Sequence, residues 1–206
     1  MAVALSDPEN IIGIKVRVGK HASGPTRIAP LISALQVADE TGLPLIYLNR
    51  VGGQDELAFD GASFVLNADR KLAWQLPDWD EALVRTDWTR TTNGWSCAPG
   101  TIAKLDDDPA DIYHAMLVGL RDYVNRNRFP GVVLGLSGGI DSALSAAVAV
   151  DALGADRVWC VMLPSRFTAD DSLEDAAECA RMLGCRLDTV PIRPAMTAFD
   201  DMLAPL

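Results

Sequence analysis

The sequence predicts an α/β protein of two domains, the second of which contains a parallel, doubly wound sheet. From residue 110 onward, helical segments alternate with short apolar runs, which is typical of parallel strands joined by crossover helices. Before residue 78 the chain has short strand signals separated by Gly and Asp turns, which indicates a different domain. The total of 206 residues is enough for one large or two small domains.

Composition excludes several classes of protein. Hydrophobic residues make up 49% of the chain, which is enough for a packed core. The net charge of −10 argues against a general nucleic-acid or membrane-surface binder. No signal peptide or membrane-length apolar run is present, and the four cysteines lack paired zinc spacing. We therefore expect reduced, mostly structural thiols in a cytoplasmic protein.

The first half is expected to contain one helix, at residues 31–41, where apolar residues recur with helical spacing and Gly42 follows as a stop. Residues 49–57 are expected to form a polar, glycine-rich loop in which Asp55 and Glu56 are turn formers. A hairpin turn is expected near residues 67–71. The expected strands are residues 11–18, 43–48 (buried), 64–66 and 72–74.

Residues 79–108 show no hydrophobic period and are interpreted as a linker. The acidic run before Pro109 is interpreted as a helix-start signal, in preference to a metal site. An apolar stripe predicts a helix from there to about Arg126. Ser172 begins an expected capping box, and Gly154 and Gly184 are expected helix stops. The expected strands are residues 132–136, 157–162 and 187–192, and the expected helices are 143–153, 172–183 and one from 197.

The loop between the first of these strands and its helix has the composition of an anion-binding turn. Two adjacent glycines, Gly138 and Gly139, can adopt unusual backbone angles and leave room for a ligand. The following helix offers free N–H groups and the positive end of its dipole, which suit phosphate. Ser137 and Ser142 can add hydroxyl donors, and Asp141 can hold Mg²⁺. An ordinary strand-to-helix turn explains two glycines but not the full six-residue string.

The string Ser-Gly-Gly-Ile-Asp-Ser resembles the pyrophosphate-binding loop of the ATP pyrophosphatase superfamily, whose members activate carboxylates or amides by adenylation. It lacks the Gly-Lys-Ser/Thr ending of a Walker A loop and the Gly-x-Gly-x-x-Gly pattern. The segment from Tyr47 to Leu66 is similar to the late part of a nitrilase-type glutaminase domain, with Val-Gly-Gly-Gln-Asp-Glu-Leu followed by Phe-Asp-Gly-Ala-Ser. A nitrilase-like segment followed by a pyrophosphate-binding loop of this kind resembles the glutamine-dependent NAD⁺ synthetases.

The resemblance implies a fold and a division of the chain. Residues 1–78 would be the end of a nitrilase-like α-β-β-α glutaminase domain, and residues 79–108 a linker. Residues 109–206 would be the start of a doubly wound, adenine nucleotide α-hydrolase-like synthetase domain. The family amidates deamido-NAD⁺ to NAD⁺ with ammonia from glutamine, through an adenylated intermediate, and uses ATP and Mg²⁺.

The resemblance also assigns site residues. Leu163 and Arg166 follow the second strand in a segment that would lie over the nucleotide, although Arg166 could equally be a surface charge. Lys20 would contact glutamine, and Asp141 would bind Mg²⁺. The ATP pyrophosphate loop would be Gly135, Leu136, Ser137, Gly138, Gly139, Ile140, Asp141 and Ser142.

The chain departs from the family in ways that matter for catalysis. The glutaminase Cys, Glu and Lys would lie upstream of the matched part, and Cys97 falls in the expected linker, so no catalytic residue is assigned. A downstream Thr-Gly-Asn-Lys segment is missing. We therefore expect an incomplete fragment, inactive alone, of a family whose full-length members are homo-oligomers.

Two alternatives remain open. One is another amidotransferase with the same loop, such as a GMP or asparagine synthetase, which the nitrilase-like string disfavours because those enzymes use other glutaminase folds. The other is a non-catalytic ATP-binding remnant or interaction module, which the missing nucleophile favours.

Overall fold

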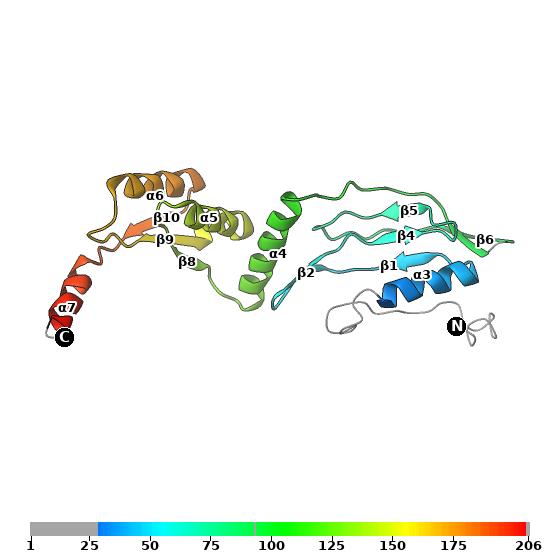
Figure 1. Ribbon diagram of the computed structural model, residues 1–206. Coiled ribbons are helices and arrows are strands. Elements are labelled where there is room, and N and C mark those ends of the chain that lie inside the picture. The colour runs from blue at the N-terminus through cyan, green and yellow to red at the C-terminus, as the bar shows by residue number, and fades with distance from the viewer. Residues whose placement is uncertain (1–28, 93, 205–206) are drawn as a thin grey trace. The chain divides into compact units, whose positions relative to one another are not determined.

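The computed structural model describes residues 29–92 and 94–204 (Figure 1). The strand expected at residues 11–18 and Lys20 lie outside these residues. The chain divides into two compact units, residues 1–51 with 60–105 and residues 52–59 with 106–206. Within the described residues, no helix is long and apolar enough to cross a membrane.

Among its described residues, the first unit has one helix and a three-stranded antiparallel sheet. Helix α3 (Ala29–Thr41) ends at Gly42, whose φ of 65° only glycine adopts easily, as predicted. The sheet order is β1-β4-β5, formed by β1 (Leu45–Tyr47), β4 (Phe64–Leu66) and β5 (Leu72–Gln75). The predicted hairpin between β4 and β5 is confirmed.

The strand predicted within residues 43–48 is present as β1, but the prediction that it is buried is wrong. Among the described residues β1 pairs with β4, and Ile46 is 63% exposed. An apolar run of this length is consistent with a buried strand, but the run itself does not show how much of the strand other elements cover.

The segment expected as a linker contains a second antiparallel hairpin, β6 (Trp88–Thr91) with β7 (Gly94–Cys97). Cys97 at its end is buried together with Val65 and Ala73, and Trp88 packs against them. The Asn67 side chain holds this end of β7, because it accepts from the Cys97 N–H at 2.8 Å and donates to the Cys97 carbonyl at 3.1 Å.

Residues 49–57 do not form the loop that was predicted. They contribute β2 (Val51–Gln54) to a hairpin with β3 (Leu57–Asp60), and Asp55 stands in its turn with a φ of 53°. Most of this hairpin belongs to the second unit. The Gly53 N–H donates to the Asp122 carboxylate at 2.8 Å, and a Cβ on Gly53 would lie 3.1 Å from the Gly119 Cα. Glycine therefore lets the hairpin backbone approach the helix that carries both partners.

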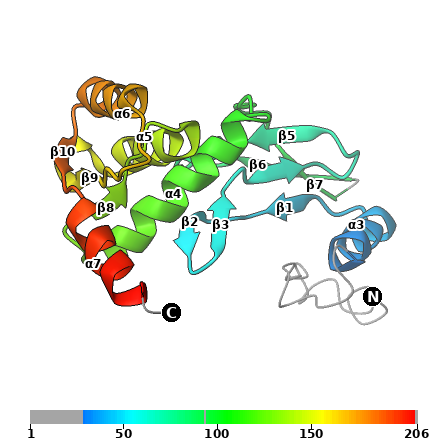
Figure 2. The same ribbon diagram turned by 60° about the vertical axis from the view of Figure 1, so that its left-hand side comes forward.

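The second unit is built on three parallel strands in the order β10-β9-β8, which confirms the predicted parallel sheet (Figure 2). Val132 pairs with Val158, and Arg186 pairs with Trp159. The strands are β8 (Val132–Gly135), β9 (Val158–Met162) and β10 (Arg186–Thr189). The helices are α4 (Ala110–Arg126), α5 (Ile140–Leu153), η2 (Ala155–Arg157), α6 (Asp170–Leu183) and α7 (Arg193–Leu203).

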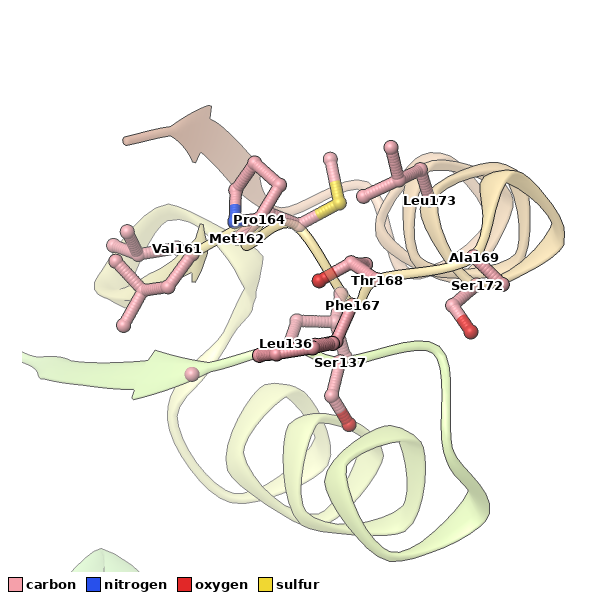
Figure 3. Close-up of a pocket in the computed structure, with 12 residues that line it drawn as sticks. Leu136, Ser137, Val161, Met162, Pro164, Phe167, Thr168, Ala169, Ser172 and Leu173 are labelled. Atoms are coloured by element: carbon pink, nitrogen blue, oxygen red, sulfur yellow. The ribbon is translucent and has the colours of Figure 1, made fainter. Parts of the chain in front are cut away.

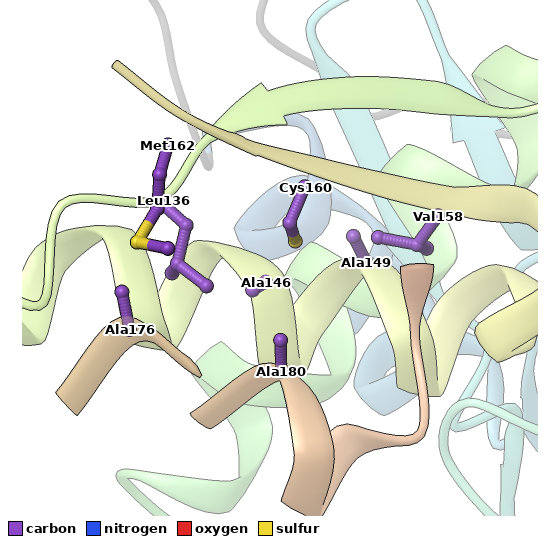
Figure 4. Packing of buried hydrophobic residues seen from close by; sticks show 8 residues of the cluster. All are labelled: Leu136, Ala146, Ala149, Val158, Cys160, Met162, Ala176 and Ala180. Atoms are coloured by element: carbon purple, nitrogen blue, oxygen red, sulfur yellow. The ribbon is translucent and has the colours of Figure 1, made fainter. Parts of the chain in front are cut away.

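The core of this unit lies between the sheet and helices α5 and α6 (Figure 4). Four alanines on the two helices face larger side chains from the strands, so the helices can pack close to the sheet. The buried residues are Leu136, Ala146, Ala149, Val158, Cys160, Met162, Ala176 and Ala180.

Four helices begin earlier than predicted: α3 at Ala29 rather than 31, α5 at Ile140 rather than 143, and α6 and α7 as follows. Helix α6 begins at Asp170 after Ala169, without a side-chain cap, so Ser172 is in the first turn and is no N-cap. Two aspartates at the start supply negative charge at the positive end of the dipole, which replaces the expected cap. Helix α7 begins at Arg193 rather than 197, with a proline in its first turn. The stops at Gly154 and Gly184 are confirmed.

Candidate functional site

A pocket of about 460 Å³ opens where strands β8 and β9 end (Figure 3). In parallel α/β sheets, ligands usually bind at this carboxyl edge. Three hydroxyl residues, Ser137, Thr168 and Ser172, are among the residues that line it. The lining residues are Gly135, Leu136, Ser137, Val161, Met162, Leu163, Pro164, Phe167, Thr168, Ala169, Ser172 and Leu173.

The two serines of the predicted phosphate loop are hydrogen-bonded to each other and to the loop backbone. The Ser142 hydroxyl donates to the Gly139 carbonyl at 2.9 Å and accepts from the Ser137 N–H at 3.1 Å. The two hydroxyl oxygens are 3.1 Å apart, and the Gly139 N–H points to the Ser137 hydroxyl at 3.4 Å. These bonds fix the shape of the loop, so the serines organise its backbone.

The two glycines of the loop have different physical roles. Gly138 has a φ of +81°, and a Cβ there would lie 2.3 Å from the carbonyl oxygen of Ser172. Gly139 has a φ of −80° and room for a Cβ, which would lie 3.5 Å from the Ser137 hydroxyl. Only Gly138 therefore needs to be glycine for the fold, because the loop presses there against the first turn of α6.

The amino end of α5 follows this loop, and no side chain caps it. The first N–H groups of a helix have no intrahelical partner, so they can serve an anionic ligand. Asp141 stands in the first turn and is exposed. The described residues contain no group of three His, Cys, Asp or Glu side chains that could hold a metal ion. Asp141 fits Mg²⁺ only as one carboxylate beside phosphate oxygens, which is a common arrangement for this ion.

The segment between β9 and α6 forms one wall of the pocket. Its turn is held by Thr168, whose hydroxyl oxygen accepts from the Ser165 N–H at 2.9 Å. Leu163 lines the pocket as its sequence position suggested. Arg166 is not among the lining residues, because its guanidinium donates to the Asp200 carboxylate at 2.7 Å.

Sequence reasoning missed several residues that the fold brings to this wall. Phe167 and Thr168 line the pocket, but only Leu163 and Arg166 were predicted as site residues in that segment, and Ser172 was assigned to a cap. Their proximity to Leu136 depends on the packing of α6 against the loop, which no local pattern reveals. The glycine at position 138 was the available signal in the sequence, since a glycine in a tight loop can mark a place where another segment comes close.

The cysteines lie away from this pocket. Cys97 and Cys160 are buried, and all four cysteines are free thiols. Burial raises the pKa of the Cys97 thiol. The pKa of the Cys160 thiol is raised to about 12, first by burial and second by the neighbouring Cys185. Both thiols stay protonated at neutral pH, which agrees with the structural role predicted for the cysteines.

The parallel sheet, the loop at the end of β8 and the pocket define the second unit as part of an α/β domain with a ligand-sized pocket at the carboxyl edge of its strands. Residues 112–205 match the family model described as NAD synthase. A glutamine-dependent NAD(+) synthetase of Rhodobacter capsulatus is 56% identical over 165 residues, which are 80% of this chain and 30% of that protein. That of Acinetobacter baylyi is 41% identical over 82% of this chain and 31% of that protein.

Solved structures give the same result. The glutamine-dependent NAD⁺ synthetase of Acinetobacter baumannii in complex with ADP superposes with a TM-score of 0.76. It is 43% identical, over 84% of this chain and 32% of that one. A synthetase from Cytophaga hutchinsonii, at 17% identity and a TM-score of 0.62, shares the fold. Most of the chain is thus similar in sequence and fold to glutamine-dependent NAD⁺ synthetases, and it spans about a third of the length of these relatives.

Proposed function

We propose that the pocket at the end of β8 and β9 binds Mg-ATP, as part of an enzyme that converts deamido-NAD⁺ to NAD⁺ with ammonia from glutamine. The observation that carries the proposal is the combination of a preformed pocket with an uncapped helix start directly after its lining loop. The relative from Acinetobacter baumannii was solved with ADP, which supports an adenine nucleotide as the ligand.

The proposed roles follow from the geometry of the loop. Backbone N–H groups from Gly138 to Asp141 would hold the β- and γ-phosphates, while Ser137 and Ser142 keep that backbone in shape. Leu163 would contact the nucleotide from the opposite wall. Asp141 would hold Mg²⁺, which supplies neutralisation of phosphate charge when bound.

The reaction would proceed in two displacements. A carboxylate oxygen of deamido-NAD⁺ attacks the α-phosphorus of ATP, and pyrophosphate leaves. Ammonia then attacks the activated carbonyl carbon, loses a proton and displaces AMP. What the loop contributes is the positioning of the triphosphate and its stabilisation by fixed N–H dipoles.

The first unit would belong to the part of the enzyme that supplies ammonia. We infer the domain limits 1–78 and 109–206 from the resemblance of each segment, and Lys20 as a contact of glutamine. The glutaminase nucleophile is assigned to no residue of this chain. Association of identical subunits and a cytoplasmic location belong to the same proposal.

The test is MgATP binding measured by calorimetry on the full chain, with an Asp141→Ala variant. We expect a loss of tenfold or more in affinity for ATP in Mg²⁺, and little change for ATP in EDTA, because the carboxylate acts through the ion. Asp175→Ala removes an exposed carboxylate from α6, outside the lining of the pocket, and serves as the control. Absence of ATP binding by the unaltered chain at millimolar concentrations would contradict the proposal.

A further inference from the structure

The carboxyl edge of the sheet in the second unit has few positive charges. Residues 106–206 contain sixteen acidic residues, eight arginines and no lysine. The segments that follow β8, β9 and β10 are residues 136–139, 163–169 and 190–192, and Arg166 is the one Lys, Arg or His among them. The lining of the pocket contains no charged side chain. A polyphosphate bound there would therefore have Arg166 as its nearest cationic partner on these segments.

Arg166 is engaged elsewhere in this structure. Its Nη1 donates to the Asp200 Oδ2 at 2.7 Å, and both side chains are about half exposed, at 50% and 52%. The guanidinium carbon also lies 5.0 Å from the centre of the Phe167 ring, and Phe167 lines the pocket. The guanidinium thus contacts a ring that lines the cavity and is paired with an acid.

Backbone contacts hold Asp200 within reach of this arginine. The chain after β10 runs beside the end of β9, because the Val190 N–H donates to the Met162 carbonyl at 2.8 Å. The Ile192 N–H then donates to the Pro164 carbonyl at 3.1 Å, immediately before α7 begins. The start of α7 is therefore held beside the segment that carries Arg166, and the Arg166–Asp200 ion pair joins the helix to that segment.

We propose that Asp200 sets the affinity of the pocket for polyphosphate by competing with the ligand for Arg166. This inference rests on the proposed binding of ATP. In the structure described here, Asp200 is the counter-charge of Arg166. When ATP binds, a phosphate replaces the carboxylate, and the guanidinium turns across Phe167 toward the pocket. Arginine suits this exchange because its planar fork binds carboxylate and phosphate in the same way.

The energy of the exchange is small, because the ion pair is exposed. Pairs of this kind contribute little to stability, so a charged ligand can displace one. Releasing Arg166 should tighten ATP binding by about two- to fivefold, which corresponds to the usual range for exposed ion pairs. A ligand without phosphate gains nothing from a released guanidinium, so its affinity should stay the same.

The experiment compares Asp200→Asn with the unaltered chain by calorimetry, using MgATP and adenosine as the two ligands. Asp201→Asn is the matched control, because it removes the same charge from the neighbouring position of α7, and Asp201 is also exposed. The Asp200 substitution is repeated in an Arg166→Met background. Thermal unfolding of each variant checks that the fold is unchanged.

We expect Asp200→Asn to tighten MgATP by two- to fivefold, to leave adenosine unchanged and to have no effect once Arg166 is Met. Asp201→Asn should change MgATP affinity by less than Asp200→Asn does. Unchanged or weaker MgATP binding in Asp200→Asn overturns the inference, as does equal tightening of adenosine or persistence of the effect without Arg166. If the unaltered chain binds MgATP, those results leave the proposed function intact; if it does not, both fail.

Discussion

Substituting Gly138 tests the central contact of the site, the packing of the phosphate loop against α6. Alanine at this position must adopt a φ near +81°, and its Cβ would lie 2.3 Å from the Ser172 carbonyl oxygen and 2.9 Å from the Ser172 Cα. The backbone conformation costs about 1–2 kcal/mol for a residue with a side chain. Relief of the clash requires the loop or the helix to move, at a cost of about 1–3 kcal/mol. We expect Gly138→Ala to lower the free energy of unfolding by about 2–5 kcal/mol.

The adjacent glycine supplies the control. Gly139→Ala places a Cβ 3.5 Å from the Ser137 hydroxyl, at an ordinary φ of −80°. Alanine is less favourable than glycine at the start of a helix, so Gly139→Ala should lower the free energy of unfolding by about 0.5 kcal/mol. Urea unfolding followed by circular dichroism measures both variants. Both glycines adjoin the proposed phosphate positions, so stability separates the two roles better than ATP binding. Equal stability of Gly138→Ala and Gly139→Ala would refute this account of the loop.

Two further predictions concern stability. The folded-state pKa of Cys160 is raised from 9.0 to about 12, so its thiol stays protonated where the unfolded chain ionises. The free energy of unfolding should therefore be unaffected by Cys160 below pH 9 and decrease as the pH rises from 9 toward 12, and urea unfolding should show a shallower decrease for Cys160→Ala. Gly119→Ala should raise the free energy of unfolding by up to about 1 kcal/mol, because the helix interior around that position has open space for a Cβ. Gly100→Ala is its opposite control in urea unfolding, since its Cβ would lie 1.9 Å from the Trp74 ring; equal effects at the two positions would contradict the packing described.

Elements with strong local signals could be predicted from the sequence. The carboxyl ends of four helices were predicted correctly, from the apolar stripe of α4 and from the glycines at 42, 154 and 184. These predictions succeeded because a helix end depends on the residues next to it. The parallel strands β8 and β9 were found for the same reason, as apolar runs between helices. The carboxyl edge of these strands then placed Leu163 near the phosphate loop, as the structure shows.

Features that depend on distant residues could not be predicted. Gly53 and Asp122 are 69 positions apart, and nothing near either residue indicates their hydrogen bond. The strand β1 was expected to be buried, because its apolar run does not show how much of the strand other elements cover. Arg166 was expected near the nucleotide or in solvent, and its partner Asp200 lies 34 positions away on a helix whose start was itself misplaced.

The composition of the second unit explains why its site depends so strongly on the backbone. A segment with twice as many acidic as basic residues offers an unfavourable field to a polyphosphate, and the pocket lining provides no side-chain charge against it. The hydroxyl groups of Ser137 and Ser142 are committed to each other and to the loop. For the proposed ATP, the remaining attractions would be the N–H groups at the start of α5, a divalent ion beside Asp141 and the guanidinium of Arg166. Each of these acts over a short range, so binding should require the exact loop conformation that Gly138 permits. A shift of the loop would therefore weaken ATP binding more than the loss of either serine hydroxyl from a loop that keeps its shape.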